Sequence, residues 1–177
     1  ALALSLEALG VKRLCIHGRT WERRYSGPVS GGQIRDVVRA LSIPVVANGG
    51  IFCRADADGL AASAGTEMLM VARGAIGNPW VFRGLLGDGD GVPGHEELCR
   101  ELRLHIEGMV ELYGEEIAMR NGRKIALAYL VGRGYRRTLR AQVTGISTMR
   151  QFDELMSVIQ EEGPTEGYRH VSGADCV

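Results

Sequence analysis

Two apolar segments of this chain end in small residues, and their strand ends, Asn48 and Ala72, are 24 residues apart. The first segment, residues 43–51, reads IPVVANGGI, and the second, residues 68–80, reads MLMVARGAIGNPW. Successive βα units of an α/β barrel have this form, and their small residues leave backbone N–H groups free to hold a phosphate. The sequence therefore favours part of a barrel with a phosphate-bearing ligand at these strand ends.

Strands and helices are predicted to alternate through the first half of the chain. Apolar runs predict strands over residues 13–17, 43–47 and 67–72, and helical patterns cover residues 2–9, 33–41 and 54–64. Near-continuous apolar strands are typical of a parallel sheet covered on both faces, and three such units fit one side of a barrel. A complete (β/α)8 barrel needs about 250 residues, whereas this chain has 177. We expect the missing barrel half to come from the same longer chain or from a second chain.

The pattern changes at a loop of turn-forming residues, GDGDGVPG, at positions 87–94. Beyond this loop, apolar residues at helical spacing predict one helix that ends at Tyr113-Gly114, a second over 121–135 and a third over 148–160. The predicted fold is α/β, a partial TIM (β/α)8 barrel followed by a small all-helical domain. The predicted domains are a partial barrel over 1–86, a linker over 87–94, a helical domain over 95–161 and a tail over 162–177.

Basic and acidic residues balance across the chain, with 21 of each, so no overall field for nucleic acid or a membrane is predicted. Locally the two charges separate. Residues 120–140 contain seven cations and no acid: Arg120, Arg123, Lys124, Arg133, Arg136, Arg137 and Arg140. One interpretation is an anion-binding face; the other is a solvated helix that pairs with the acidic helix before it.

The four cysteines, Cys15, Cys53, Cys99 and Cys176, have spacings that fit neither paired metal ligands nor a disulfide framework. We expect reduced thiols and a cytoplasmic protein, with Cys53 at the start of a helix. No apolar run approaches the roughly 18 residues of a membrane span, so no membrane partner is predicted. The chain opens inside a predicted helix and without Met, which we expect of a piece of a longer protein.

Small and polar residues at the predicted strand ends are the candidates for the ligand site. Gly49 and Gly50 follow Asn48 and let the backbone approach an anion closely. Arg73 follows the third strand and has the planar geometry that binds phosphate bidentately. His17 ends the first strand, so its ring should face the same mouth. The alternatives are an ordinary βα turn, a surface ion pair and a structural histidine.

Three ordered motifs resemble successive strand-end motifs of the tRNA-dihydrouridine synthases. They are IHGRT with YSG at residues 16–20 and 25–27, ANGGI at 47–51 and ARGAIGNPW at 72–80. A looser likeness to the helical domain of that family covers RKIALAYL at 123–130. The resemblance extends over about residues 1–160 and implies the C-terminal part of a TIM barrel, its last three strands, followed by the helical domain.

This resemblance implies an FMN-dependent enzyme in which NADPH reduces the flavin. A hydride then passes to a uracil ring of folded tRNA, and a cysteine protonates the other carbon. The residues that match the family's FMN-binding motifs are His17, beside the flavin, and, at the phosphate, Asn48, Gly49, Gly50, Ala72 and Arg73. The residues of the basic helices that would lie along the tRNA backbone, acting on phosphate charge, are Arg123, Lys124, Arg136 and Arg137.

The sequence departs from the family pattern in two places. Gly50 stands where the family usually has an acidic or amide residue, so any contact there must come from the backbone. The family's catalytic cysteine and a flavin-contacting lysine belong to earlier strands, and none of this chain's cysteines falls in a matching motif. We therefore expect no catalytic residue in this chain and no activity from it alone. Another flavin or sugar-phosphate barrel, and a non-catalytic RNA-binding module, remain as alternatives.

Overall fold

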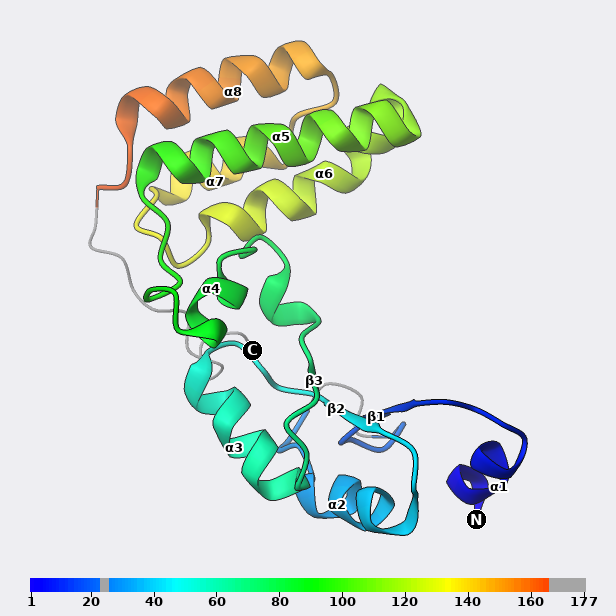
Figure 1. The fold of residues 1–177 in the computed structure, drawn as a ribbon. Helices are drawn as coiled ribbons and strands as arrows, with labels where there is room; N and C mark the ends of the chain where they lie inside the picture. Colours follow the sequence, from blue (N-terminus) through cyan, green and yellow to red (C-terminus); the bar gives the residue numbers. More distant parts are fainter. Residues whose placement is uncertain (23–25, 166–177) are drawn as a thin grey trace. The chain divides into compact units, whose positions relative to one another are not determined.

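A computed structural model describes residues 1–22 and 26–165 of the chain. It contains two compact units (Figure 1). Among the described residues, the first consists of residues 1–22, 26–75 and 81–88, and the second of residues 76–80 and 89–165. Of the predicted tail, residues 166–177 lie outside the described residues.

The first unit is built on a parallel sheet of three strands in the order β1-β2-β3. These strands are β1 (Leu14–His17), β2 (Val45–Asn48) and β3 (Leu69–Met70). His17 pairs with Asn48, and Asn48 pairs with Met70. This register brings the carboxyl ends of all three strands to one edge of the sheet, where a barrel carries its ligand-binding loops.

Two helices, α2 (Gly31–Ala40) and α3 (Arg54–Ala64), cover one face of this sheet, and the short helix α1 (Leu2–Ala8) precedes β1 (Figure 1). The Ser30 hydroxyl accepts a hydrogen bond from the Gln33 N–H and caps α2. The core between these helices and the sheet includes the buried side chains of Ile34, Val45, Ala47, Leu60 and Ala64.

The opposite face of the sheet is exposed at β1 and Met70 and partly buried along β2 in the described part of the chain. Successive residues of a strand point to opposite faces, and in β1 the side chains of Cys15 and His17 are exposed whereas Leu14 and Ile16 are partly buried. Within the described residues the sheet is therefore covered on one face only, which is consistent with the prediction of three units from one side of a barrel. Apolar strands reveal that a sheet has a buried face, but they do not reveal whether its second cover lies in the same segment of chain.

The third strand is shorter than the predicted 67–72. The side-chain amide of Asn48 donates a hydrogen bond to the Met70 carbonyl at 2.7 Å, so a side chain takes the acceptor that would extend the ladder. A 3-10 turn, η1 (Arg73–Ala75), follows, and then the short helix α4 (Val81–Leu86), which the sequence pattern did not predict.

The second unit contains α5 (His95–Tyr113), α6 (Glu115–Leu130), α7 (Arg137–Val143) and α8 (Met149–Glu162). The predicted end of α5 at Tyr113-Gly114 is confirmed, because Gly114 has a φ of 76°. The second helix runs from 115 to 130 and not from 121 to 135, and α7 was not predicted. Gly132 and Gly134, with φ angles of 75° and 78°, end the helical path after Leu130. The largest buried side chains of this unit include Leu102, Ile106, Met119, Leu130, Phe152 and Met156.

Residues 76–80, which the sequence assigns to the first domain, pack within the second unit. The Trp80 ring meets the Tyr129 ring edge-on, with 5.8 Å between the centroids. Gly77 has a φ of 65°, and a Cβ atom there would lie 2.6 Å from the Tyr129 nitrogen, closer than real contacts allow. This segment therefore lies directly against the backbone of α6.

Candidate functional site

The six residues proposed for cofactor binding line one cavity of about 310 Å³ at the carboxyl ends of the strands: His17, Asn48, Gly49, Gly50, Ala72 and Arg73. β1 contributes the histidine, β2 contributes the asparagine and glycines, and the segment after β3 contributes the last two. Ile51, Phe52, Met70 and Gly74 complete the lining. The parallel register accounts for this convergence, because it aligns the ends of neighbouring strands.

A chain of hydrogen bonds fixes the orientation of the His17 ring. The Asn48 amide nitrogen donates to the Met70 carbonyl at 2.7 Å, so its oxygen is left to accept. His17 Nδ1 lies 2.7 Å from that oxygen and therefore carries the hydrogen that it donates. In the neutral ring, Nε2 is then an acceptor. The three strand ends thus hold one tautomer of the histidine in place.

Glycine is required where the backbone approaches these side chains. Gly49 has a φ of 130°, and a Cβ atom there would lie 3.2 Å from His17 Cε1 and 3.1 Å from Val29. A Cβ atom at Gly74 would collide with the Ile51 carbonyl oxygen. The loops that follow β2 and β3 therefore meet backbone against backbone, and their glycines line the cavity without side chains.

Arg73 is positioned by its own loop and by a neighbouring aromatic ring. It begins η1, and its guanidinium carbon lies 5.8 Å from the centroid of the Phe52 ring, within the range of cation–π attraction. Phe52 is itself held by its backbone N–H, which donates to the Asp56 carboxylate at 3.0 Å. A cation and several backbone groups thus border one small cavity, a donor set that suits a phosphate.

Sequence reasoning gave no role to Arg19, although it lies in the IHGRT motif. Its Nε donates to the Gly27 carbonyl at 2.9 Å. Burial lowers the pKa of the Arg19 guanidinium, and the nearby charge of Arg73 lowers it further. The signal that could have found it is its position two residues beyond the strand-end His17.

No cysteine among the described residues lines this cavity. Cys53 precedes α3, as expected, and its N–H donates to the Asp56 carboxylate at 3.1 Å. Cys15 lies on the exposed sheet face, where its thiol is 3.2 Å from the Met70 sulfur. Cys99 is buried among the helices of the second unit, at 2% exposure. Cys176 lies outside the described residues.

The seven cations of residues 120–140 do not form one common face. Arg133 is only 5% exposed; it donates to the Tyr129 carbonyl at 2.7 Å and to the Asn78 side chain at 3.0 Å. Arg123 is partly buried and donates to the Ile146 carbonyl at 2.6 Å. The interpretation of all seven as an anion-binding face is therefore wrong, because these two hold loops of the helical unit by satisfying backbone carbonyls.

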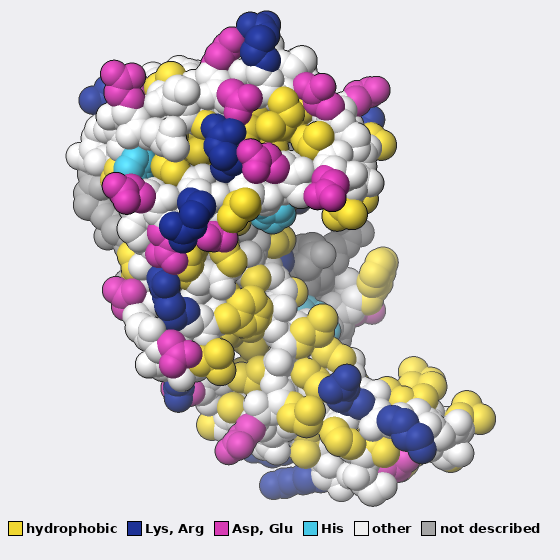
Figure 2. All heavy atoms as spheres, turned by 45° about the horizontal axis from the view of Figure 1, so that its top comes forward, with side chains coloured by type: hydrophobic (Ala, Val, Ile, Leu, Met, Phe, Trp, Pro, Cys, Tyr) yellow, Lys and Arg dark blue, Asp and Glu magenta, His cyan; other side chains and the backbone are white. Residues whose placement is uncertain are grey.

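The remaining predicted RNA contacts are on the surface. Lys124 and Arg137 are exposed, and within the described residues neither has a hydrogen bond or an ion pair. Arg136 is exposed and lies 3.8 Å from the Glu162 carboxylate. On the face of the helical unit visible in Figure 2, acidic and basic side chains are interspersed, and Arg103 of α5 pairs with Asp153 of α8 at 2.6 Å.

The described part of the chain contains neither a metal-binding cluster nor a membrane-spanning helix. No group of three or more histidine, cysteine, aspartate or glutamate side chains in residues 1–22 and 26–165 is arranged to hold a metal ion. Within the same residues, every helix is too short or too polar to cross a membrane.

A family model and individual relatives point to the same protein family. A model of the family described as dihydrouridine synthase matches residues 1–162. The tRNA-dihydrouridine synthase B of Pasteurella multocida is 34% identical over 136 residues, which are 74% of this chain and 41% of that protein. A probable tRNA-dihydrouridine synthase of Mycobacterium leprae is 31% identical over 157 residues, 85% of this chain and 41% of the relative. The chain thus spans about 41% of the length of these curated relatives.

Proposed function

This chain belongs to the dihydrouridine synthase family, and we propose that it is part of an enzyme that reduces uridine in tRNA to 5,6-dihydrouridine. One observation carries the proposal. The six residues that match the cofactor motifs come from three separate strand ends and line a single cavity of about 310 Å³. An alternative barrel with a different ligand would not account for the family match over the helical unit as well.

We propose that FMN is the cofactor and that its phosphate binds at Gly49, Gly50, Ala72 and Arg73. The residues present fit this group, because the glycines admit no side chain at the loop contacts and Arg73 supplies a positive charge. Backbone N–H groups and a guanidinium are the donors that phosphate sites use. When bound, the flavin would carry a hydride from NADPH to the uracil ring.

His17 and Asn48 would orient the cofactor from the β1 and β2 strand ends. The bond from His17 Nδ1 to Asn48 leaves Nε2 as the acceptor of the neutral ring. Such an acceptor can receive a hydrogen bond from a donor on the flavin or on the uracil. Since three strands fix the pair, it would bind its ligand without first having to rearrange.

tRNA is the proposed partner of the helical unit, and a tRNA substrate implies a cytoplasmic location. Lys124 and Arg137 are exposed and, among the described residues, lack internal partners, so both can neutralise phosphates of an RNA backbone. Arg136 can do so by exchanging its ion pair with Glu162, whose 3.8 Å separation at the surface makes it weak. Arg123, engaged with the Ile146 carbonyl, would act by shaping this surface.

We further propose that the proton donor of the reaction is a cysteine from outside these 177 residues. Within the described residues, the thiols lie on the open sheet face, at the start of α3 or in the helical core, and none of these cysteines is among the residues that line the cavity. The exposed sheet face would be closed by a complementary barrel half from a longer chain or a second chain. This chain by itself would then bind its ligands but not turn them over.

The first test is fluorescence titration of the chain with FMN and with riboflavin, which lacks the phosphate. Arg73→Ala should weaken FMN about 10- to 100-fold, because a charge-assisted hydrogen bond contributes about 1.5–3 kcal/mol. Riboflavin binding should change little. Arg39→Ala, at an exposed arginine of α2 in the same unit, is the matched control and should bind FMN like the wild type.

Two outcomes would contradict these proposals. Equal loss of FMN and riboflavin binding in Arg73→Ala would show that the arginine does not contact the phosphate. Reduction of tRNA uridine by NADPH with this chain alone, measured by loss of NADPH absorbance and detection of dihydrouridine, would show that the proton donor lies within it.

A further inference from the structure

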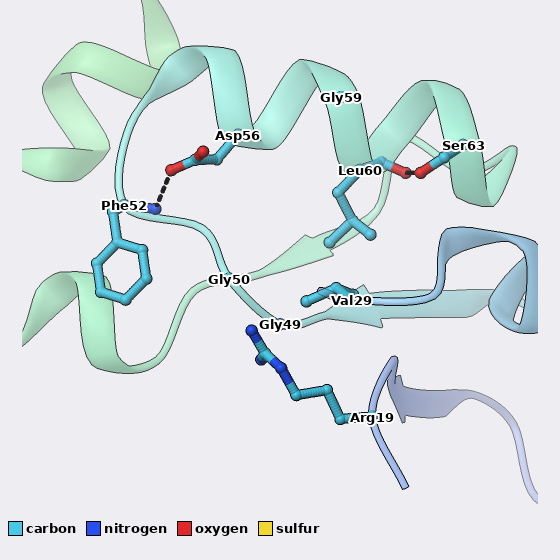
Figure 3. A pocket seen from close by; sticks show the side chains of 9 residues that line it. All are labelled: Arg19, Val29, Gly49, Gly50, Phe52, Asp56, Gly59, Leu60 and Ser63. Carbon is cyan, nitrogen blue, oxygen red and sulfur yellow. Dashed lines mark hydrogen bonds between the residues drawn. The ribbon is translucent and has the colours of Figure 1, made fainter. Parts of the chain in front are cut away.

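A second cavity, of about 360 Å³, lies beside the Gly49-Gly50 loop (Figure 3). It shares Gly49, Gly50 and Phe52 with the first cavity but is otherwise lined by Arg19, Val29 and α3. In the close view, the Arg19 side chain extends toward Gly49 and its guanidinium ends beside the loop. The loop is therefore bordered by two cavities, each of which contains an arginine.

Arg19 has donors that the described residues do not use. Its Nε donates to the Gly27 carbonyl, but Nη1 is buried and has no hydrogen-bond partner within residues 1–22 and 26–165. A buried donor that lacks a hydrogen-bond partner destabilises the folded state, so an acceptor from a ligand would be favoured there. The lowered pKa of Arg19 has burial as its main cause and the charge of Arg73 as its second.

The other polar side chains of this cavity already have partners. The Asp56 carboxylate accepts hydrogen bonds from the N–H groups of Phe52 and Cys53, at 3.0 and 3.1 Å. The Ser63 hydroxyl donates to the Leu60 carbonyl at 3.1 Å. These groups hold the turn into α3 and its backbone. The Arg19 guanidinium is therefore the polar side-chain group of the cavity that still has a hydrogen-bond donor without a partner in the described residues.

Gly50 explains why the charge of Arg19 is not compensated internally. A Cβ atom at Gly50 would lie 3.8 Å from Arg19 Nη2, so a short acidic side chain there would reach the guanidinium. Its φ of 66° is left-handed, a conformation that Asp and Asn tolerate better than other side chains. Because this chain has glycine, the position is left open to an anion from outside.

We infer that this second cavity is a phosphate-binding subsite in which Arg19 supplies the charge, separate from the cavity of His17, Asn48 and Arg73. A phosphate is favoured because its oxygens match the fork of guanidinium donors and because the Gly49-Gly50 backbone leaves room for them. The phosphate belongs to the RNA backbone, because the proposed function places the single phosphate of FMN at Arg73. Only this choice of carrier rests on the proposed function.

The test follows the Arg19 Nε–Hε resonance by NMR during titration of the chain with inorganic phosphate. The resonance is assigned by its loss in Arg19→Gln. Gly50→Asp should supply the missing carboxylate and weaken phosphate binding about tenfold or more relative to Gly50→Asn, its neutral isostere with the same backbone demand. Arg13→Gln, at an exposed arginine ahead of β1, should leave phosphate binding unchanged.

Two further titrations of Arg19→Gln identify the carrier. A loss of FMN affinity of about tenfold or more, with riboflavin unaffected, would mean that the FMN phosphate itself binds Arg19, which contradicts a separate subsite for RNA. Unchanged FMN affinity together with a tRNA salt slope lower by about one assigns it to RNA. The inference is overturned if inorganic phosphate leaves the Arg19 resonance unmoved or if Gly50→Asp and Gly50→Asn bind phosphate equally. The titration with inorganic phosphate tests the subsite even if the chain binds no flavin. A failure of the subsite can therefore be distinguished from a failure of the proposed function.

Discussion

Single residues in the helical unit are held by polar contacts that the hydrophobic pattern does not reveal. His95 Nε2 lies 3.2 Å from the Gln160 carbonyl, and Nδ1 lies 2.8 Å from the Tyr135 hydroxyl. A carbonyl only accepts, so Nε2 donates to it, and in the neutral ring Nδ1 accepts from the tyrosine. Burial raises the pKa of Tyr135. The hydroxyl is therefore held protonated as the donor of a buried contact between α5 and the segment before α7.

Tyr135→Phe should lower stability at neutral pH by about 1–2 kcal/mol, because His95 Nδ1 loses its donor. Above about pH 10, where an unfolded tyrosine ionises, the unfolded state of the wild type binds fewer protons than the folded state. Wild-type stability should therefore fall with rising pH, by up to about 1.4 kcal/mol per pH unit from this group. Urea unfolding at pH 8 and pH 11, followed by circular dichroism, measures both effects.

The phenylalanine variant should show a shallower loss between the two pH values. Tyr113→Phe is the control, because Tyr113 is an exposed tyrosine of the same unit and should change neither quantity. Equal pH slopes for the wild type and Tyr135→Phe would mean that Tyr135 ionises as readily in the folded state as in the unfolded chain.

Residue roles at the candidate site could be predicted only where they follow from strand position. His17, Asn48 and Arg73 were found because parallel strands end together, and all three line one cavity. Arg133 was misjudged because a charge in a basic run looks the same in sequence whether it faces water or, as here, backbone carbonyls. Arg19 was missed because its significance depends on Gly50, 31 positions later, and on the fold that joins them.

At the scale of elements, two adjacent cations of α6 have different surroundings and therefore different tasks. Arg123 turns inward to the Ile146 carbonyl, and Lys124 turns outward. Neighbouring helical positions are about 100° apart around the axis, so one can stabilise the unit while the next remains available to a partner. Net charge along the helix therefore overstates the number of cations that an RNA can meet.

Lys124→Ala and Arg123→Ala should separate these tasks. Lys124→Ala should reduce the salt slope of tRNA binding by about one and leave thermal stability unchanged. Arg123→Ala should cost about 1–2 kcal/mol of stability, since the Ile146 carbonyl loses its donor. Filter binding of a tRNA transcript at several salt concentrations, with thermal unfolding of the same samples, provides both readouts. A stability loss in Lys124→Ala equal to that of Arg123→Ala would contradict this division.

Element boundaries were predicted well where a cap residue marks them and poorly elsewhere. The helix over 54–64 was predicted to the residue, because Gly65, with a φ of 68°, closes it. The start of α6 was placed six residues late, although its acidic first turn, Glu115 and Glu116, follows Gly114 directly. α4 and α7 have six and seven residues, too few for helical periodicity to identify them.

At the scale of the whole molecule, the sheet face that carries Cys15 and His17 is the surface of the first unit that lacks a covering layer within the described residues. Parallel sheets are normally covered on both sides, and here one side has α2 and α3 while the other is exposed in the described residues. A complementary barrel half would bury this face and surround the cavity at the strand ends. Thiol chemistry can report whether the face is open.

Cys15 should react with N-ethylmaleimide at pH 8 about tenfold or more faster than Cys99, because access to Cys99 requires local unfolding. Burial raises the pKa of both thiols, so the difference reflects access to the reagent. Mass spectrometry of proteolytic peptides gives the two rates, and Cys15→Ser identifies the peptide. Protection of Cys15 in this chain would mean that something already covers the sheet face, and self-association would then be measured by sedimentation.

Residues 76–80 pack in the second unit and residues 81–88 in the first, so the chain passes between the units after 75, after 80 and after 88. This interleaving limits how the two parts can be exchanged between genes. A recombination event in the glycine-rich segment 87–94 would transmit the helices without Trp80 and Gly77, which contact Tyr129. A new partner for either unit would have to arrive with a matching crossover segment, so the two units should share one line of descent.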